Sequence, residues 1–228
     1  AIVGVHPIHT SKSFHDVQEL GEGGKEFTSR GEEFDYDYYK KLSVHPKVVG
    51  IGECGLDYYR LKIKDLSFKQ EREKQEEAFR QQIELAIEVK KPLMLHIRNG
   101  SGRSAYGDAF SLLKSYNFNL TTGLPGNLHF FAGSTDEAQP FLDAGFSFSF
   151  TGVISFTHDY DEIVRYLPLE RILSETDSPY VAPVPYRGTR NEPLYVKEVV
   201  KAIAAIRGED EERIRRVIAE NARRLFNL

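Results

Sequence analysis

The sequence predicts an α/β fold of the TIM-barrel-like kind, in which parallel strands alternate with helices. Short apolar runs alternate along the chain with helical patterns, and several runs are apolar throughout. Continuously apolar strands are typical of parallel sheets that are covered on both faces. Strands that alternate with helices indicate a doubly wound sheet or a (β/α)8 barrel. The glycine motifs G-x-G-x-x-G and G-x-x-x-x-G-K-[ST] are absent, which favours the barrel.

The predicted elements follow one another in a regular order. Apolar runs predict strands at residues 2–5, 48–51, 92–97, 127–131, 146–150 and 171–174. Helical patterns cover residues 67–90, 106–116, 136–144, 160–167, 193–207 and 211–226. Pro140 predicts that the third of these helices is short or kinked. Residues 21–37 show no periodicity, and we expect a surface loop there.

Length, composition and charge limit the class of protein. The 228 residues suit a single domain over 1–228, and 40% hydrophobic content supplies a sizeable core. The net charge of −4 argues against a general polyanion-coating protein, although a local basic patch or bound cations can receive phosphates. A single cysteine, Cys54, excludes an internal disulfide and a thiolate zinc site. No apolar run is long enough to span a membrane, and we expect an intracellular protein, cytoplasmic or nuclear.

Ionisable side chains come at the ends of the predicted strands. Glu53 follows the second strand, His96 and Arg98 close the third, His129 lies in the fourth, and Asp177 follows the sixth. Because the carboxyl ends of barrel strands converge on the face that holds the active site, we expect these side chains to meet. Two imidazoles and two carboxylates suit Zn²⁺, Mn²⁺ or Mg²⁺. Two adjacent ions would lower the pKa of a shared water and stabilise charge on a phosphoryl group.

Each of these residues also has an ordinary structural interpretation. A histidine at a strand end is commonly a satisfied polar residue, Glu53 would be a loop acid, and Asp177 a turn or helix-cap residue. Arg98 would be an ion-pair partner of Asp108 or Glu53, or a clamp for phosphate. His6 either faces a substrate or belongs to a turn before proline. The joint pattern favours a metal site.

The sequence also resembles a known family over its whole length. The matching stretches are VGVHP at 3–7, VGIGECGLDYY at 49–59, KPLMLHIR at 91–98, HFFAG at 129–133, LSETDSPY at 173–180, RNEP at 190–193 and NARRLF at 221–226. These stretches are similar to those of the TatD family of metal-dependent deoxyribonucleases, which belongs to the amidohydrolase-like barrels. The blocks around GECGLDY and ETDSP are highly specific.

The resemblance implies a function and a role for each candidate residue. Glu53 would bridge or ligate the metals, His96 and His129 would be ligands, and Asp177 would be a ligand that also activates the attacking water. The substrate contacts would come from Arg98 and His6, against the scissile or a flanking phosphate. The implied reaction is phosphodiester hydrolysis in DNA, trimming single strands in the 3′-5′ direction, with two divalent ions (Mg²⁺, Mn²⁺ or Zn²⁺) in the complete family member.

The sequence departs from the family pattern in two places. Phe130 stands where the family usually has cysteine, and Ala132 where serine is commoner. The family also opens with a strand that ends in Asp-x-His-x-His, and nothing of that kind precedes Ala1. We therefore expect a barrel that lacks its first two βα units, is poorly stable alone and binds at most one metal well. The alternatives are a metal-dependent hydrolase of another ester or amide, and an inactive truncated form or pseudoenzyme.

Overall fold

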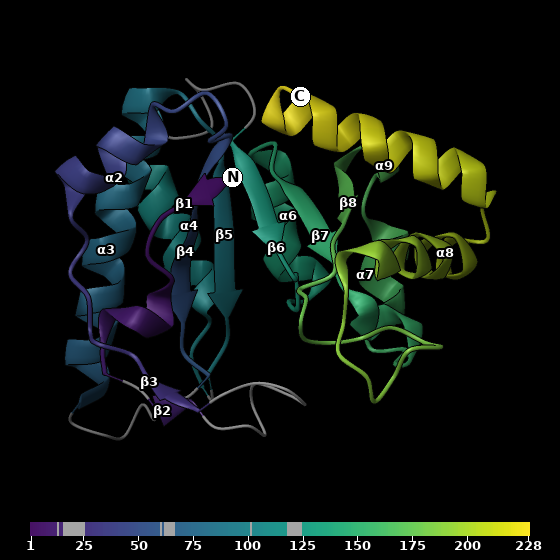
Figure 1. Ribbon diagram of the computed structural model, residues 1–228, viewed down its shortest axis with the longest axis horizontal. Helices are drawn as coiled ribbons and strands as arrows, with labels where there is room; N and C mark the ends of the chain where they lie inside the picture. Colours follow the sequence, from purple (N-terminus) through teal and green to yellow (C-terminus); the bar gives the residue numbers. More distant parts are fainter. Residues whose placement is uncertain (13, 16–25, 60, 62–66, 101, 118–124) are drawn as a thin grey trace. The chain divides into compact units, whose positions relative to one another are not determined.

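The computed structural model describes residues 1–12, 14–15, 26–59, 61, 67–100, 102–117 and 125–228 (Figure 1). Its residue contacts divide the chain into two compact units. The first unit comprises Ala1–Ser13, Thr28–His129 and Asp136–Phe146. The second comprises Phe14–Phe27, Phe130–Thr135 and Ser147–Leu228. Each unit is described by itself below.

Parallel strands form the centre of the first unit. They pair in the order β1 (Ile2–Val3), β4 (Gly50–Asp57), β5 (Leu93–Arg98) and β6 (Gly126–His129). Apolar side chains of these strands, such as Ile51 and Leu95, are fully buried. Burial of the strands on both faces explains why their sequences are apolar throughout. The pairing of β5 with β6 sets His96 directly beside His129. A separate two-stranded sheet pairs β2 (Phe14–His15), which is counted with the second unit, and β3 (Phe27–Thr28), which begins in that unit.

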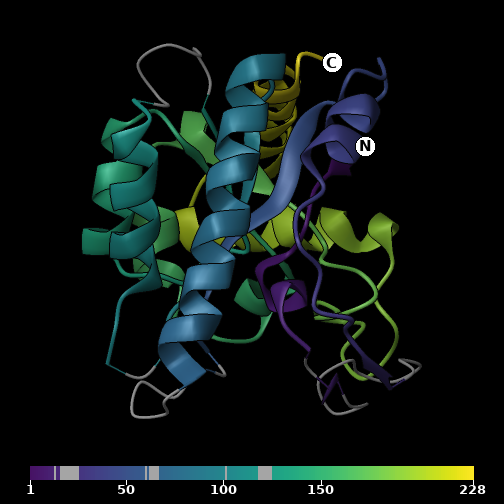
Figure 2. The same cartoon turned by 90° about the vertical axis from the view of Figure 1, so that its left-hand side faces the viewer.

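Helices pack on these strands. The helical elements are η1 (Pro7–Thr10), α2 (Tyr36–Ser43), α3 (Ser67–Val89), α4 (Ala105–Ser115) and α6 (Thr135–Asp143). The longest, α3, packs on β4 and η1, while α4 packs on β4 and β5 (Figure 2). Phe79, Ile83 and Ala86 on α3 are fully buried, so the stripe that predicted this helix is the face that meets the sheet.

The second unit contains two parallel strands, β7 (Ser147–Phe150) and β8 (Ile172–Ser174). Its helical elements are η2 (Gly152–Ser155), α7 (Asp161–Tyr166), η3 (Leu169–Arg171), η4 (Pro193–Tyr195), α8 (Val196–Arg207) and α9 (Glu211–Phe226). Figure 1 shows α8 beside α9, and both pack on β8. Asn221 of α9 ties the helix to the strand, because its amide donates to the carbonyls of Leu169 and Ile172.

The structure confirms the alternation of strands and helices and moves several boundaries. β4 continues to Asp57 instead of ending at residue 51, because its pairing with β5 continues past a register shift between Gly52 and Cys54. The strand predicted at 127–131 ends at His129, because Phe130 has a φ of 44° that a strand does not accommodate. Strand β1 likewise ends at Val3, before residue 5.

The loop predicted at 21–37 is too long at its far end. Helix α2 begins at Tyr36, where the Asp35 side chain accepts a hydrogen bond from the backbone N–H of Tyr38 and so caps the helix. Residues 21–25 of that prediction lie outside the described residues. Within the part of the chain that the structure describes, no helix combines the length and apolar character needed to cross a membrane.

Candidate metal centre

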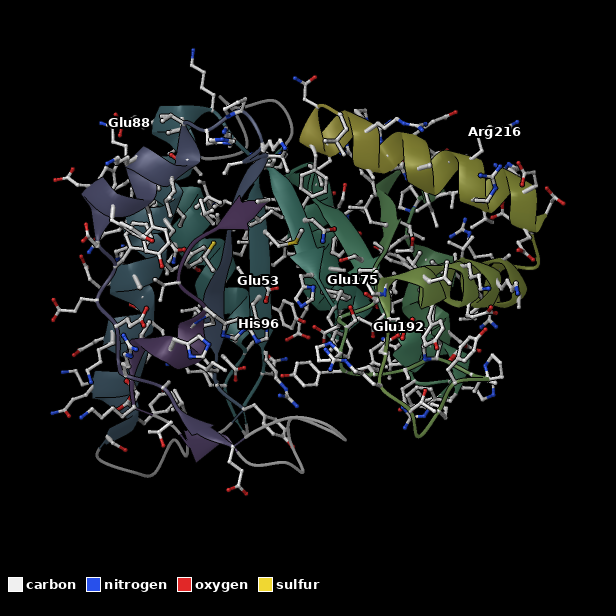
Figure 3. The ribbon with its side chains drawn as sticks, viewed as in Figure 1. Glu53, Glu88, His96, Glu175, Glu192 and Arg216 are labelled. Carbon is white, nitrogen blue, oxygen red and sulfur yellow. The ribbon has the colours of Figure 1, made fainter. Side chains whose placement is uncertain are left out.

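Four candidate residues of the first unit come together: one follows a strand, two lie within strands and one ends a strand. They are His6 after β1, Glu53 in β4, His96 in β5 and His129 at the end of β6. Metal-ligating atoms of His6, Glu53 and His96 all lie within 4.8 Å of one another. The Nε2 atoms of His6 and His129 are each 3.7 Å from Oε2 of Glu53. Figure 3 shows Glu53 and His96 close together, with Glu88 at the opposite end of this unit.

The spacing of this cluster fits a divalent ion. A nitrogen–oxygen distance of 3.7 Å is too long for a hydrogen bond. Ligands that lie roughly 2.0–2.2 Å from one ion at tetrahedral angles are about 3.3–3.6 Å apart, close to the separation seen. The donor set of one carboxylate and several imidazoles suits zinc or manganese as well as magnesium. The residues present therefore fit a divalent metal.

Asp57, at the end of β4, holds the ring of His96. Its Oδ2 lies 2.9 Å from Nε2 of His96, and its side chain is 7% exposed. Burial by itself would raise the pKa of Asp57, but the hydrogen bond and charge of His96, with help from the N–H of Tyr59 and from Arg98, lower it below its usual value. Because an ionised carboxylate only accepts, the single proton of the neutral His96 ring lies on Nε2, and its lone pair lies on Nδ1. A carboxylate behind a ligating histidine is a common arrangement in metal sites.

His6 has the opposite arrangement of hydrogen bonds. Its Nδ1 accepts from the backbone N–H of Ile8 at 3.2 Å, which caps η1. Nδ1 is therefore unprotonated, and in the neutral ring the proton lies on Nε2, the atom that faces Glu53. A ring in this form donates a hydrogen bond through Nε2 and has no lone pair there for a metal. His6 thus belongs to the turn through Nδ1, and its Nε2 faces Glu53.

Arg98 stacks on an aromatic ring at the end of β5. Its guanidinium carbon lies 3.6 Å from the centroid of the Tyr59 ring, and the side chain is exposed. Asp108, one of the partners weighed for Arg98, pairs instead with Arg103 at 2.6 and 2.9 Å and with the Tyr58 hydroxyl at 2.9 Å. The Tyr59 ring thus holds the guanidinium of Arg98 by cation–π contact. The N–H groups at the edge of a guanidinium can still donate hydrogen bonds to an anion.

Asp177 belongs to the second unit, in the loop that follows β8. Its backbone adopts a left-handed φ of 55°, which aspartate tolerates better than most residues, and its carbonyl accepts from the N–H of Tyr180. Glu175 precedes it and accepts from the N–H of Phe130 at 2.6 Å and from the hydroxyl of Ser149 at 2.7 Å. Glu175 thereby joins the start of the Asp177 loop to Phe130 and to Ser149 of β7.

Asn191 holds the rest of that loop. Its side-chain amide donates to the carbonyls of Thr176 and Tyr180, at 2.8 and 2.6 Å, and its own N–H donates to the carbonyl of Pro179. The side-chain oxygen accepts from the N–H of Glu192, so every polar atom that the side chain offers is used. Since Asn191 is only 2% exposed, these bonds are shielded from water and set the shape of the turn around Asp177.

Sequence reasoning missed Asp57 and Asn191 as supporting residues. The predicted strand ends at residue 51, whereas β4 contains both Glu53 and Asp57. Their even spacing along one strand, which would have suggested that they share a face, therefore could not be used. Asn191 lies in the family-like RNEP block, but nothing in a linear sequence indicates which carbonyls a buried amide will meet. Both residues act through hydrogen bonds that only the folded chain brings together.

Comparison with known proteins identifies a family for this arrangement. Residues 1–227 match a family model described as TatD related DNase. The curated relatives include an uncharacterized metal-dependent hydrolase, YabD, of Bacillus subtilis, 39% identical and covering 86% of this chain and 72% of the relative. A second such hydrolase, YcfH of Escherichia coli, is 33% identical, with 99% and 72% covered. A protein named 3′-5′ ssDNA/RNA exonuclease TatD, from Musicola paradisiaca, is 35% identical, with 99% and 75% covered.

Solved structures agree on the fold. The structure of YJJV, a TatD homologue from Escherichia coli, has a TM-score of 0.74 at 23% identity, and the match covers 100% of this chain and 76% of that one. A TatD family hydrolase from Entamoeba histolytica has a TM-score of 0.71 at 22% identity, with 99% and 73% covered. These similarities confirm the predicted α/β, TIM-barrel-like fold class.

Proposed function

Because the chain belongs to the TatD-related DNase family and is a metal-dependent hydrolase, we propose that its substrate is nucleic acid and that it cleaves phosphodiester bonds. DNA single strands, trimmed in the 3′-5′ direction, are the proposed substrate. One observation carries the proposal, the grouping of the Glu53 carboxylate with the rings of His96 and His129, beside the N–H donor His6. The name of the Musicola paradisiaca relative supports the substrate class.

Three residues of the first unit are proposed to hold a divalent ion, namely Glu53, His96 through Nδ1 and His129 through Nε2. Magnesium, manganese and zinc all suit this set, and Asp177 is proposed as a further ligand. A bound ion polarises the phosphate and lowers the pKa of an attacking water. Asp57 holds His96 in the form that offers its lone pair to the ion.

The remaining groups are proposed to act on the substrate. Asp177 accepts a proton from the attacking water, whose oxygen bonds to phosphorus as the bond to the 3′ oxygen breaks. Nε2–H of His6 donates to a phosphate oxygen, for which the hydrogen bond from Ile8 prepares it. Arg98, stacked on Tyr59, presents its guanidinium edge to a flanking phosphate. These roles give each predicted site residue a distinct task.

The Asp177→Asn variant tests the proposal. The change is nearly isosteric, so the fold and the metal affinity supplied by Glu53 should largely persist. Hydrolysis of a 5′-labelled single-stranded oligonucleotide in Mn²⁺ should fall about 10²–10⁴-fold, because proton acceptance from water is lost. Product ladders on a denaturing gel measure the rate and the direction of trimming.

Two outcomes would overturn these assignments. Undiminished hydrolysis by Asp177→Asn would remove its proposed role. Rapid turnover of a carboxylic ester or amide by the wild type, with no cleavage of any oligonucleotide, would replace the substrate class. As a matched variant, Glu53→Ala should lose metal affinity itself, measured by calorimetric titration with Zn²⁺ and with Mn²⁺.

A further inference from the structure

An aromatic and basic patch lies on the second unit. We name it the 156–195 patch, and its members are Phe156, Val184, Tyr186, Arg187, Leu194 and Tyr195. Phe156 is 41% exposed, Val184 46% and Leu194 67%. Three of the large apolar side chains that the described residues expose thus gather in one small region, which is the usual sign of a binding surface.

Direct contacts hold the patch together. The guanidinium carbon of Arg187 lies 3.8 Å from the centroid of the Phe156 ring. The rings of Tyr186 and Tyr195 are stacked, with centroids 3.8 Å apart and an angle of 4° between the planes. The N–H of Val184 donates to the hydroxyl of Ser155, which joins the loop to the turn that carries Phe156. The patch therefore presents flat faces in fixed positions.

The patch lies on the same connections of the second unit as the Asp177 loop. Phe156 follows β7 through η2, and Val184 to Tyr195 lie in the connection that leaves β8. Both connections start at the carboxyl ends of neighbouring parallel strands, the end that carries the active site in barrel enzymes. Asn191, in the same connection, is bonded to the Asp177 loop. The patch and Asp177 are therefore parts of one bonded segment.

The charge of this connection differs from that of the whole chain. Residues 178–197 contain three basic side chains, Arg187, Arg190 and Lys197, against one acidic side chain, Glu192, while the chain as a whole carries −4. Arg187 and Arg190 are exposed. A positive, aromatic segment on an acidic protein is complementary to a polyanion whose flat bases are accessible, which describes a single strand better than a duplex.

We propose that the 156–195 patch binds single-stranded nucleic acid, stacking one or two bases on Phe156 and the tyrosine pair while Arg187 and Arg190 contact phosphates. The inference rests on the proposed function and extends it, since it locates a stretch of strand beyond the scissile bond. Stacking on a ring is tolerant of sequence because every base has a flat face. The patch therefore supplies affinity for single strands without base specificity.

Binding in the absence of metal tests the patch separately from catalysis. A fluorescein-labelled oligothymidylate of about 15 nucleotides is titrated in EDTA and followed by fluorescence anisotropy. The variants are Phe156→Leu and Arg187→Gln. Phe156→Leu should raise the Kd about tenfold by removing a stacking face. Arg187→Gln should also lower the slope of log K against log salt by about 0.7, because one phosphate contact is lost.

Matched control variants lie elsewhere on the same unit. Tyr166→Leu removes an aromatic ring of similar exposure at the end of α7. Arg216→Gln removes an exposed arginine on α9, which Figure 3 shows well separated from Glu192 of the patch connection. Both should bind as the wild type does. An abasic strand of equal charge should bind the wild type more weakly than the thymidylate, and Phe156→Leu should abolish this difference.

Failure of the patch can be told from failure of the proposed function. If Phe156→Leu and Arg187→Gln bind like the controls while the wild type still cleaves oligonucleotides, only the patch assignment is wrong. If the wild type neither binds nor cleaves any oligonucleotide, the proposed function is wrong as well. If the patch variants change only self-association, measured by sedimentation velocity, the occupant is a second copy of the chain, and the nucleic-acid assignment is overturned.

Discussion

His6 and His96 lie with their rings 4.1 Å apart, yet their hydrogen bonds prepare them for different tasks. Asp57 accepts a hydrogen bond from Nε2–H of His96, so the lone pair of the neutral ring lies on Nδ1, whereas the N–H of Ile8 donates to Nδ1 of His6, so the proton of that ring lies on Nε2. A metal needs the lone pair of a neutral ring, and a phosphate oxygen needs an N–H. Two identical residue types thus become a ligand and a donor through the partner on the far nitrogen.

The first prediction at this scale concerns Asp57. Asp57→Ala should weaken the affinity for Zn²⁺ and Mn²⁺ about 10- to 100-fold, because His96 loses the carboxylate that orients it. Calorimetric titration measures the affinity. In the metal-free protein, ¹⁵N correlation spectra should show the His96 ring losing its single Nε2-protonated form, a change that a general loss of packing would not produce.

Asp108→Asn provides the control for Asp57. Asp108 bonds to Tyr58 and Arg103 and contacts no candidate metal ligand, so its variant should keep the wild-type metal affinity. Equal losses of affinity in both variants would mean that burial of a carboxylate in this unit, and not its contact with His96, supports the site.

At the scale of an element, α3 holds two separate segments of the site through buried amides. Gln82 accepts from the N–H of Val5 and donates to its carbonyl, at 2.8 and 3.1 Å, just before His6. Gln75, seven residues earlier, does the same for the backbone of Asp57, at 2.8 and 2.9 Å. Seven residues are two turns, so both amides lie on one face of the helix. This long helix therefore positions two segments that are far apart in sequence.

This arrangement predicts the effect of removing one amide. Gln82→Met keeps the volume but leaves a buried N–H and a buried carbonyl of Val5 unpaired. The free energy of unfolding should fall by about 2–5 kcal/mol, since each unsatisfied group costs about 1–3 kcal/mol. Urea denaturation measures it. Gln81→Met is the control, because the half-buried Gln81 donates to Glu77 in a solvent-exposed hydrogen bond across one turn, and a change of less than about 0.5 kcal/mol is expected. Similar losses in the two variants would refute the role given to Gln82.

At the scale of the whole molecule, the metal centre should be coupled to folding. Four strands of the first unit contribute residues to one cluster, so an ion that binds there favours the folded state over the unfolded chain. The stabilisation follows from mass action and depends on the free concentration of the ion relative to its Kd.

Removal of the metal is therefore expected to lower thermal stability as well as activity. At a free Mn²⁺ concentration about 100 times the Kd, the folded state gains about 2.7 kcal/mol. For a chain of this size EDTA should then lower the Tm by roughly 5–10 °C, measured by circular dichroism or calorimetry. Glu53→Ala should show no such shift between EDTA and Mn²⁺. A Tm that is insensitive to metal in the wild type, with activity intact, would contradict the proposed centre.

The class of fold and most of the candidate cluster could be predicted from residue patterns alone. Buried strands are apolar throughout and helices carry an apolar stripe, so both can be identified from local patterns. The rule that strand ends converge was enough to group Glu53, His96 and His129, and the structure brings these three together with His6. The capped helix α2 was missed because its short apolar pattern is weak beside a long polar stretch.

The side chains that support the site, and the protonation of its histidines, could not be predicted before the folded structure was known. The pairing of Asp57 with His96, of Gln82 with Val5 and of Asn191 with the Asp177 loop each joins residues at least eleven positions apart, through hydrogen bonds that no local pattern encodes. The choice between a ligand and a donor also depends on such a bond, since a histidine's tautomer is set by its neighbours in space. Local propensity thus explains the elements, and long-range hydrogen bonding explains the chemistry.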